Sequence, residues 1–181
     1  MELRRTVVSN AIAKFSQGQV GPREIAVIAS DATVDRMGDI IEPHGVQLDN
    51  YRRNPIVLAQ HDADSPVGRC ISIGVEGGAV RAKIQFAPEG VSELADEYCR
   101  LAKTGIISAV SVGFAPLKSE PIRDEKGRST GGLRFTSWEL LELSLVSVPA
   151  NPAAVVIARS APTDELLEAA AAGRRMRHRR Q

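Results

Sequence analysis

The chain has 181 residues, a length that suits one compact domain with a tail. Hydrophobic residues make up 43% and charged residues 25% of the chain, so the bulk of it is expected to fold as a globular protein. The formal net charge is only +1, which argues against a globally basic nucleic-acid-binding protein. The sequence has no apolar run of about eighteen residues and no secretory signal, and we therefore expect a soluble protein that stays in the cytoplasm.

Short segments rich in Val and Ile, each bounded by Gly, Pro, Asn or Asp, recur along the chain and predict β-strands. In chain order these segments are 23–30, 54–60, 79–87, 106–114 and 140–148. Most of the body of the protein is therefore expected to be β-structure.

Two helices and one long connection are predicted between and after these strands. Apolar residues recur at three- and four-residue steps over 91–103, which predicts a helix that stops near Gly105. A second helix is predicted over 164–172, with Thr163 as its N-cap. The polar, glycine-bearing stretch 118–132 is interpreted as a long mobile loop between two strands.

The fold class follows from this order of elements. Strands that look antiparallel, with one helix inserted mid-chain, predict a mainly β protein with flanking helices (α+β), arranged as a small barrel or sandwich rather than a parallel βαβ sheet. We expect three parts: a lead-in at 1–22, one folded domain at 23–160, and a C-terminal helix with a basic tail at 161–181.

The two cysteines, Cys70 and Cys99, lie in unrelated segments without close spacing. Neither a disulfide framework nor a zinc pattern is indicated, so both are predicted to be reduced structural thiols.

The candidate general base is one of three histidines. His178 lies in the arginine-rich tail, where a stable catalytic geometry is not expected. His61 follows the apolar run 55–59 and precedes a polar stretch, so it is expected at the end of a strand, which is a rigid mount for a base. His44, in a Pro-His-Gly turn, is the alternative.

The candidate nucleophile and acid lie in two later strands. Ser111 occurs in a strand-like run of small residues that allows a substrate backbone to approach. A serine hydroxyl needs an imidazole partner, and that imidazole is usually oriented by a third polar group. Alternation over 138–146 puts Glu142 and Ser144 on one strand face, so Glu142 is the best third member. Ser108 and Ser144 remain rival nucleophiles.

The residues also allow two other kinds of site. A metal hydrolase would use His44, His61, Asp62 and Asp64, but no metal-binding motif with the right spacing occurs. Nucleic-acid binding would rest on the tail 173–181, which carries five arginines and one histidine but no interleaved aromatic residues.

Three separated motifs resemble those of the tailed-phage prohead proteases. In chain order they are NPIVLAQHD at 54–62, SVGF at 111–114 and LELSLVSVPANP at 141–152. Shorter matches, including DRMGD at 35–39 and PVGR at 66–69, extend the resemblance over roughly 25–154.

The resemblance carries expectations for the fold and the site. It implies a β-barrel of the herpesvirus capsid-protease type, wrapped by helices, and a prohead protease domain at 23–160. It also implies that His61 is the general base, Ser111 the nucleophile and Glu142 the acid, with Glu139 in reserve. Backbone N–H groups near Ser111 or in a loop after residue 115, or Arg69, are candidates for the oxyanion donors.

The resemblance further implies a serine endopeptidase that cleaves the scaffolding or delta segment of the major capsid protein, and itself as well, during head maturation. The expected partners are the capsid protein as substrate and further copies of this chain as a homo-oligomer, with no membrane and with nucleic acid only through the tail. No cofactor or metal is expected. The expected location is the host bacterial cytoplasm, inside the prohead. The competing interpretation is an inactive head-assembly module with the same fold.

Overall fold

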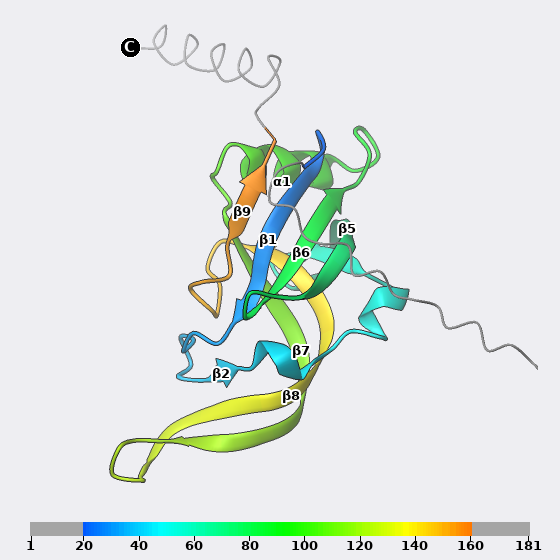
Figure 1. Cartoon of the computed structure of the whole chain (residues 1–181). Coiled ribbons are helices and arrows are strands. Elements are labelled where there is room, and N and C mark those ends of the chain that lie inside the picture. Colours follow the sequence, from blue (N-terminus) through cyan, green and yellow to red (C-terminus); the bar gives the residue numbers. More distant parts are fainter. Residues whose placement is uncertain (1–19, 161–181) are drawn as a thin grey trace, which may run out of the picture.

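The computed structural model describes residues 20–160, and within them β-strands dominate. A nine-stranded sheet is joined by the helix α1 (Glu93–Lys103), which lies across one end of it (Figure 1). Short 3-10 helices, Pro43–Gly45 and Tyr51–Arg53, interrupt the first connections. The strands are β1 (Glu24–Asp31), β2 (Ile40–Ile41), β3 (Val46–Gln47), β4 (Ile56–Ala59), β5 (Asp62–Glu76), β6 (Ala79–Phe86), β7 (Ala109–Arg123), β8 (Ser129–Val146) and β9 (Val156–Arg159).

The long strand β8 organises the sheet. The strand order is β2-β8-β4-β5-β6-β1-β9, and β3 and β7 also pair with β8. β7 runs antiparallel to β8, whereas β2, β3 and β4 run parallel to it. The sheet is therefore mixed, with parallel pairs beside the antiparallel ones that the sequence pattern suggested. Parallel pairing of β4 with β8 needs a long connection between the two strands, and β5, β6, α1 and β7 together form it.

The mainly β class is confirmed, but a closed barrel is not shown. The strand order runs from β2 to β9 without returning on itself. Only an isolated bridge, Ala109 with Val155, connects the start of β7 to the segment before β9. The hydrogen bonds from Val110 N–H to Ala154 O (3.0 Å) and from Val156 N–H to Ser108 O (2.9 Å) flank this bridge.

All five predicted strands are present, but the sequence analysis missed β5. This 15-residue strand starts with exposed polar residues and contains Pro66, Gly68 and Gly74, which conceal the alternation expected of a strand. β5 nevertheless pairs with β4 on one side and with β6 on the other. As a result, the residues after His61 belong to a strand rather than to a loop.

The predicted loop at 118–132 was also wrong. β7 continues to Arg123 and β8 begins at Ser129, so these residues form a two-stranded ribbon that extends away from the rest of the sheet (Figure 1). Asp124 closes the ribbon's turn by accepting hydrogen bonds from the N–H groups of Lys126 and Arg128, both at 2.9 Å. Both faces of the ribbon are largely exposed, so its sequence lacks an apolar period.

The helix α1 agrees with its prediction to within two residues. Ser92 is the N-cap, and its hydroxyl accepts a hydrogen bond from Ala95 N–H at 3.2 Å. The helix stops before Gly105, which has a φ of +79° that only glycine adopts readily. The second predicted helix at 164–172 and the basic tail lie outside the described residues.

The core lies on the inner face of β7 and β8, opposite the candidate site. Val110, Leu143 and Leu145 are fully buried there. Leu141, expected on the same face, is instead 53% exposed because the register of β7 and β8 shifts between Gly113 and Phe114. Cys70 and Cys99 are buried free thiols, as predicted. No helix within residues 20–160 is long and apolar enough to span a membrane.

Candidate active site

A tight turn at the end of β4 presents His61. Ala59 pairs with Asp62, and the two residues between them, Gln60 and His61, have φ values of +54° and +63°. Positive φ at both central residues is the pattern of a type I′ hairpin turn, which is normally made by Asn and Gly. For other residues the left-handed conformation costs roughly 1–2 kcal/mol each, so the surrounding structure must hold this turn in place.

The side chain of Gln60 provides that restraint. Its Nε2 donates to Ser147 Oγ at 3.0 Å and to the hydroxyl of Tyr98 on α1 at 3.3 Å. Its Oε1 accepts from the N–H of Ser147 at 3.2 Å, and its own N–H donates to Leu145 O at 2.9 Å. The turn that carries His61 is therefore tied to both β8 and α1.

Glu142 contacts the imidazole directly. His61 Nδ1 lies 2.6 Å from Glu142 Oε1, and the two side chains are 43% and 17% exposed. Ser144 links the two residues through its hydroxyl, which donates to Glu142 Oε2 at 2.5 Å and accepts from the His61 N–H at 3.2 Å. With Nδ1 committed to the carboxylate, Nε2 is the ring nitrogen left to exchange a proton.

Ser111 lies on the same face of the sheet as this pair. It is the register partner of Ser144, and Gly113 is the register partner of Glu142. Residues paired across antiparallel strands share a face, so Ser111, Ser144 and Glu142 all point away from the core. Ser111 is 6% exposed, and its hydroxyl has no hydrogen-bond partner among residues 20–160, so it is not bonded to His61 in this structure.

The rival site residues occupy other environments. Ser144 is fully buried and its hydroxyl proton is already donated to Glu142. Ser108 is exposed just before β7, and His44 is exposed in its 3-10 helix. Glu139, the reserve acid, accepts a hydrogen bond from Asn50 Nδ2 at 2.7 Å and is not paired with His61.

The described part of the chain contains no group of three or more His, Cys, Asp and Glu side chains that could hold a metal ion. Asp62 is instead engaged locally, accepting from Asp64 N–H at 3.0 Å and from Ser65 Oγ at 2.6 Å. These two bonds hold the pKa of Asp62 below its ordinary value, the Ser65 bond contributing most. The residues of the metal-hydrolase alternative therefore do not form a cluster in 20–160.

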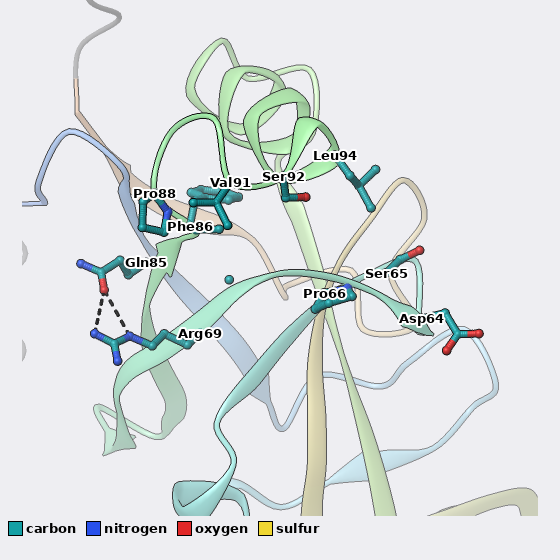
Figure 2. A pocket seen from close by; sticks show the side chains of 12 residues that line it. Asp64, Ser65, Pro66, Arg69, Gln85, Phe86, Pro88, Val91, Ser92 and Leu94 are labelled. Carbon is teal, nitrogen blue, oxygen red and sulfur yellow. Dashed lines mark hydrogen bonds between the residues drawn. The ribbon is translucent and has the colours of Figure 1, made fainter.

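A hollow of about 920 Å³ lies between β5, the end of β6 and the start of α1 (Figure 2). It begins at Asp64 and Ser65, close in the chain to His61, and reaches Arg69. Arg69 donates through Nε and Nη2 to Gln85 Oε1, at 3.2 and 3.0 Å. The expected oxyanion loop after residue 115 does not exist, because β7 continues through it.

Sequence analysis missed the supporting roles of Gln60, Gly113 and Ser144. Ser144 was considered only as a rival nucleophile, although it links Glu142 to the His61 backbone. Gly113 belongs to the run of small residues expected to let a substrate approach Ser111, whereas the space beside Gly113 is filled by the Glu142 side chain. A glycine inside a predicted strand was the available signal for a close approach.

Comparison with known proteins places the chain in a family. The model of the caudovirus prohead serine proteases matches residues 29–168, a span that includes His61, Ser111 and Glu142. The chain belongs to the caudovirus prohead serine protease family. Membership confirms the resemblance to tailed-phage prohead proteases seen in the sequence.

Two relatives give the extent of the similarity. The capsid polyprotein of Pseudomonas phage PAJU2 is 34% identical over 139 residues, which are 74% of this chain and 20% of that protein. The prohead protease of Escherichia phage T5 is 31% identical over 141 residues, which are 75% of this chain and 62% of that protein. This chain thus covers less than two thirds of the length of either relative.

Proposed function

We propose that this chain is an endopeptidase of phage head maturation in which Ser111 is the nucleophile, His61 the general base and Glu142 the orienting acid. The observation that carries the proposal is the 2.6 Å contact between His61 Nδ1 and Glu142 Oε1, made on the sheet face that also carries Ser111, a serine whose hydroxyl is unbonded in 20–160. A base oriented by a carboxylate next to a free hydroxyl is the arrangement that acyl transfer needs.

The reaction would follow ordinary acyl transfer. Ser111 Oγ attacks the carbonyl carbon of the peptide bond while His61 Nε2 takes the hydroxyl proton. The carbon–nitrogen bond then breaks, and His61 returns the proton to the leaving amine. Water, activated by the same imidazole, releases the second product and frees Ser111. Glu142 holds the imidazole in one tautomer and stabilises its protonated form throughout.

Two features favour Ser111 over Ser144 as the nucleophile. The Ser144 hydroxyl is fully buried, and its proton is engaged by Glu142. A nucleophile must instead offer its proton to the base and its oxygen to the substrate. The Ser111 hydroxyl has no partner among residues 20–160, and catalytic hydrogen bonds are often unformed in the free enzyme, so Ser111 keeps both its proton and its oxygen available.

The proposed substrate is the scaffolding or delta segment of the major capsid protein, with this chain itself as a second substrate. The PAJU2 relative supports this choice, since a segment resembling this chain occurs in a protein named a capsid polyprotein. Cleavage would take place inside the prohead, in the cytoplasm of the bacterial host.

The remaining parts of the proposal concern architecture. We place the protease domain at 23–160, between a lead-in at 1–22 and a helix with a basic tail at 161–181. The Ala109–Val155 bridge supports a barrel of the herpesvirus-protease type, because it connects the start of β7 to the segment just before β9. We expect a homo-oligomer, with nucleic-acid contacts only through the tail.

Co-expression with the capsid protein encoded beside this gene tests the proposal. The wild-type chain should shorten the capsid subunit, as measured by intact mass spectrometry, and Ser111→Ala should leave it uncut. Ser108→Ala is the matched control, since this nearby serine is exposed and should be dispensable. Equal cleavage by wild type and Ser111→Ala would remove Ser111 as the nucleophile. No cleavage by either, with normal shells, would favour an inactive assembly module.

A further inference from the structure

We propose that the hollow beside α1 is a substrate groove that binds an extended peptide through one apolar side chain and one acidic side chain. The inference rests on the proposed endopeptidase function and adds the class of sequence that the site recognises. Four observations support it: an open strand edge, an apolar lining, an unpaired cation and continuity with the His61 turn.

The open strand edge belongs to the first part of β5. Its pairing with β6 begins only at Gly68 with Phe86, so within the described sheet residues 62–66 have a strand partner on the β4 side alone. Three residues of β5, 63–65, also bulge out between the pairs Ala59–Asp62 and Leu58–Pro66. The edge is open to main-chain hydrogen bonds from an extended peptide only at the positions that this bulge and Pro66 do not interrupt.

The groove is lined by apolar side chains from three elements. Pro66 from β5, Phe86 from β6, and Val91 and Leu94 around the start of α1 surround its centre (Figure 2). Val91 is 71% exposed, so this apolar side chain at the rim of the hollow meets water in the free protein. An apolar substrate side chain in this groove would remove Val91 from water.

Arg69 supplies a charge at one end of the groove. Figure 2 shows Arg69 and Gln85 at one end and Asp64 and Ser65 at the other. Arg69 bonds only to the neutral amide oxygen of Gln85 and makes no ion pair among residues 20–160. A guanidinium held in this way presents its remaining N–H donors to a carboxylate, so an acidic substrate residue is expected there.

Both walls of the groove lead to the His61 turn. On the β5 wall, Ser65 is four residues from His61, a span of at most about 14 Å. On the α1 wall, Leu94 is one helical turn from Tyr98, whose hydroxyl contacts Gln60 at 3.3 Å. A peptide in the groove would therefore reach the candidate active site within a few residues.

Selection from a random peptide library tests the groove without depending on catalysis. The full-length Ser111→Ala chain is used to select peptides displayed on phage, and the bound sequences are read. Peptides with an acidic residue a few positions from an apolar one should be enriched. A synthetic peptide of the enriched sequence should then bind roughly fivefold more weakly to a chain that also carries Arg69→Glu. Its binding should be weakened about tenfold or more by Val91→Asp.

Matched controls separate the groove from general surface effects. Arg53→Glu reverses the charge of an exposed arginine outside the groove, and Ile106→Asp changes a 74% exposed apolar residue after α1. Neither control should alter the enriched sequences. No enrichment, or the same enriched sequences with Arg69→Glu and Val91→Asp, would overturn the groove.

The same peptides distinguish failure of the groove from failure of the proposed function. If the wild-type chain cleaves the enriched peptides and Arg69→Glu changes which ones it cleaves, both proposals are supported. If the peptides bind in the expected pattern and wild type never cleaves them, the groove is supported and the endopeptidase function is overturned. If wild type cleaves them without regard to Arg69 or Val91, the function is supported and the groove is overturned.

Discussion

The carboxylate of Glu142 fills the space directly beside Gly113. The two residues are paired in register on β8 and β7, and a Cβ atom at position 113 would overlap Glu142 Oε1. Because Glu142 Oε1 is also the atom that contacts His61 Nδ1, the absence of a side chain at Gly113 leaves the room in which the carboxylate reaches the imidazole. A glycine on one strand thus positions a carboxylate on the next.

Gly113→Ala should therefore impair catalysis more than folding. The added methyl group must displace the Glu142 carboxylate, and a shift of about 1 Å at such a position can lower activity by about 10²-fold. The rate of capsid-subunit cleavage, followed by mass spectrometry, measures the effect. Gly74→Ala is the matched control, because a Cβ atom at this position of β5 would meet nothing within 4 Å. Equal cleavage rates for Gly113→Ala and Gly74→Ala would contradict the positioning role.

Ser144→Ala should reduce activity without abolishing it. The Ser144 hydroxyl donates to Glu142 Oε2 and accepts from the His61 N–H, so its loss loosens the acid and leaves a backbone donor unsatisfied. We expect the free energy of unfolding to fall by about 1–3 kcal/mol and cleavage to slow. Urea denaturation and the capsid cleavage rate measure the two effects separately. Complete loss of cleavage in a folded Ser144→Ala protein, with activity retained by Ser111→Ala, would reverse the assignment of the nucleophile.

Gln60→Gly should remove two opposing effects at the His61 turn: the cost of a positive φ at residue 60, and the hydrogen bonds of the Gln60 side chain that hold the turn in place. Glycine adopts a φ of +54° without cost, but it cannot make the side-chain bonds to Ser147 and Tyr98. These effects oppose each other, so the free energy of unfolding should change by no more than about 1 kcal/mol. Activity should fall nonetheless, through kcat rather than KM, because the turn that carries His61 is released from β8 and α1.

Tyr98→Phe is the companion variant for this test, since it removes only one of the bonds to Gln60. Its activity should lie between those of wild type and Gln60→Gly. Unchanged kcat in Gln60→Gly would show that the turn holds its shape without the Gln60 side chain.

The strands that carry or precede His61, Ser111 and Glu142 were predictable because each contains an apolar run with clear boundaries. The contact between His61 and Glu142 depends on the parallel pairing of β4 with β8, which places residues 81 positions apart side by side. No local pattern encodes that pairing. β5 was missed for a related reason: its first residues are polar, exposed and interrupted by Pro66, so the neighbouring strands rather than its own sequence determine its conformation.

The same limit applies to the β7–β8 ribbon, which reads as a loop because both of its faces meet solvent. The ribbon is stabilised by the backbone pairing of β7 with β8 and by the hydrogen bonds of Asp124 in the turn. Neither kind of interaction requires apolar residues at regular spacing, so the sequence shows no strand pattern there. The three motifs, by contrast, identified the family directly from the sequence, and they contain the candidate site residues His61, Ser111 and Glu142.

Asp96→Asn should lower the stability of the protein at neutral pH and have little effect in acid. The Asp96 carboxylate accepts from the Gly90 N–H at 3.0 Å and from Arg23 Nη2 at 2.6 Å, and the Gly90 bond and the Arg23 guanidinium hold its pKa below the ordinary value. A depressed folded-state pKa means that the carboxylate stabilises the folded state above the ordinary value of 3.8 and loses this effect as the pH falls through the lower, folded value.

Urea unfolding midpoints between about pH 3 and pH 7 measure this dependence. The wild-type chain and Asp96→Asn should differ most at pH 6–7, and their curves should converge as the carboxylate is protonated. Asp49→Asn is the control, because the Asp49 side chain is 96% exposed and should show no such trend. A constant difference across the whole range would mean that the variant acts through packing at the start of α1. In that case the Arg23–Asp96 ion pair, which joins α1 to the residue preceding β1, would contribute no pH-dependent stability.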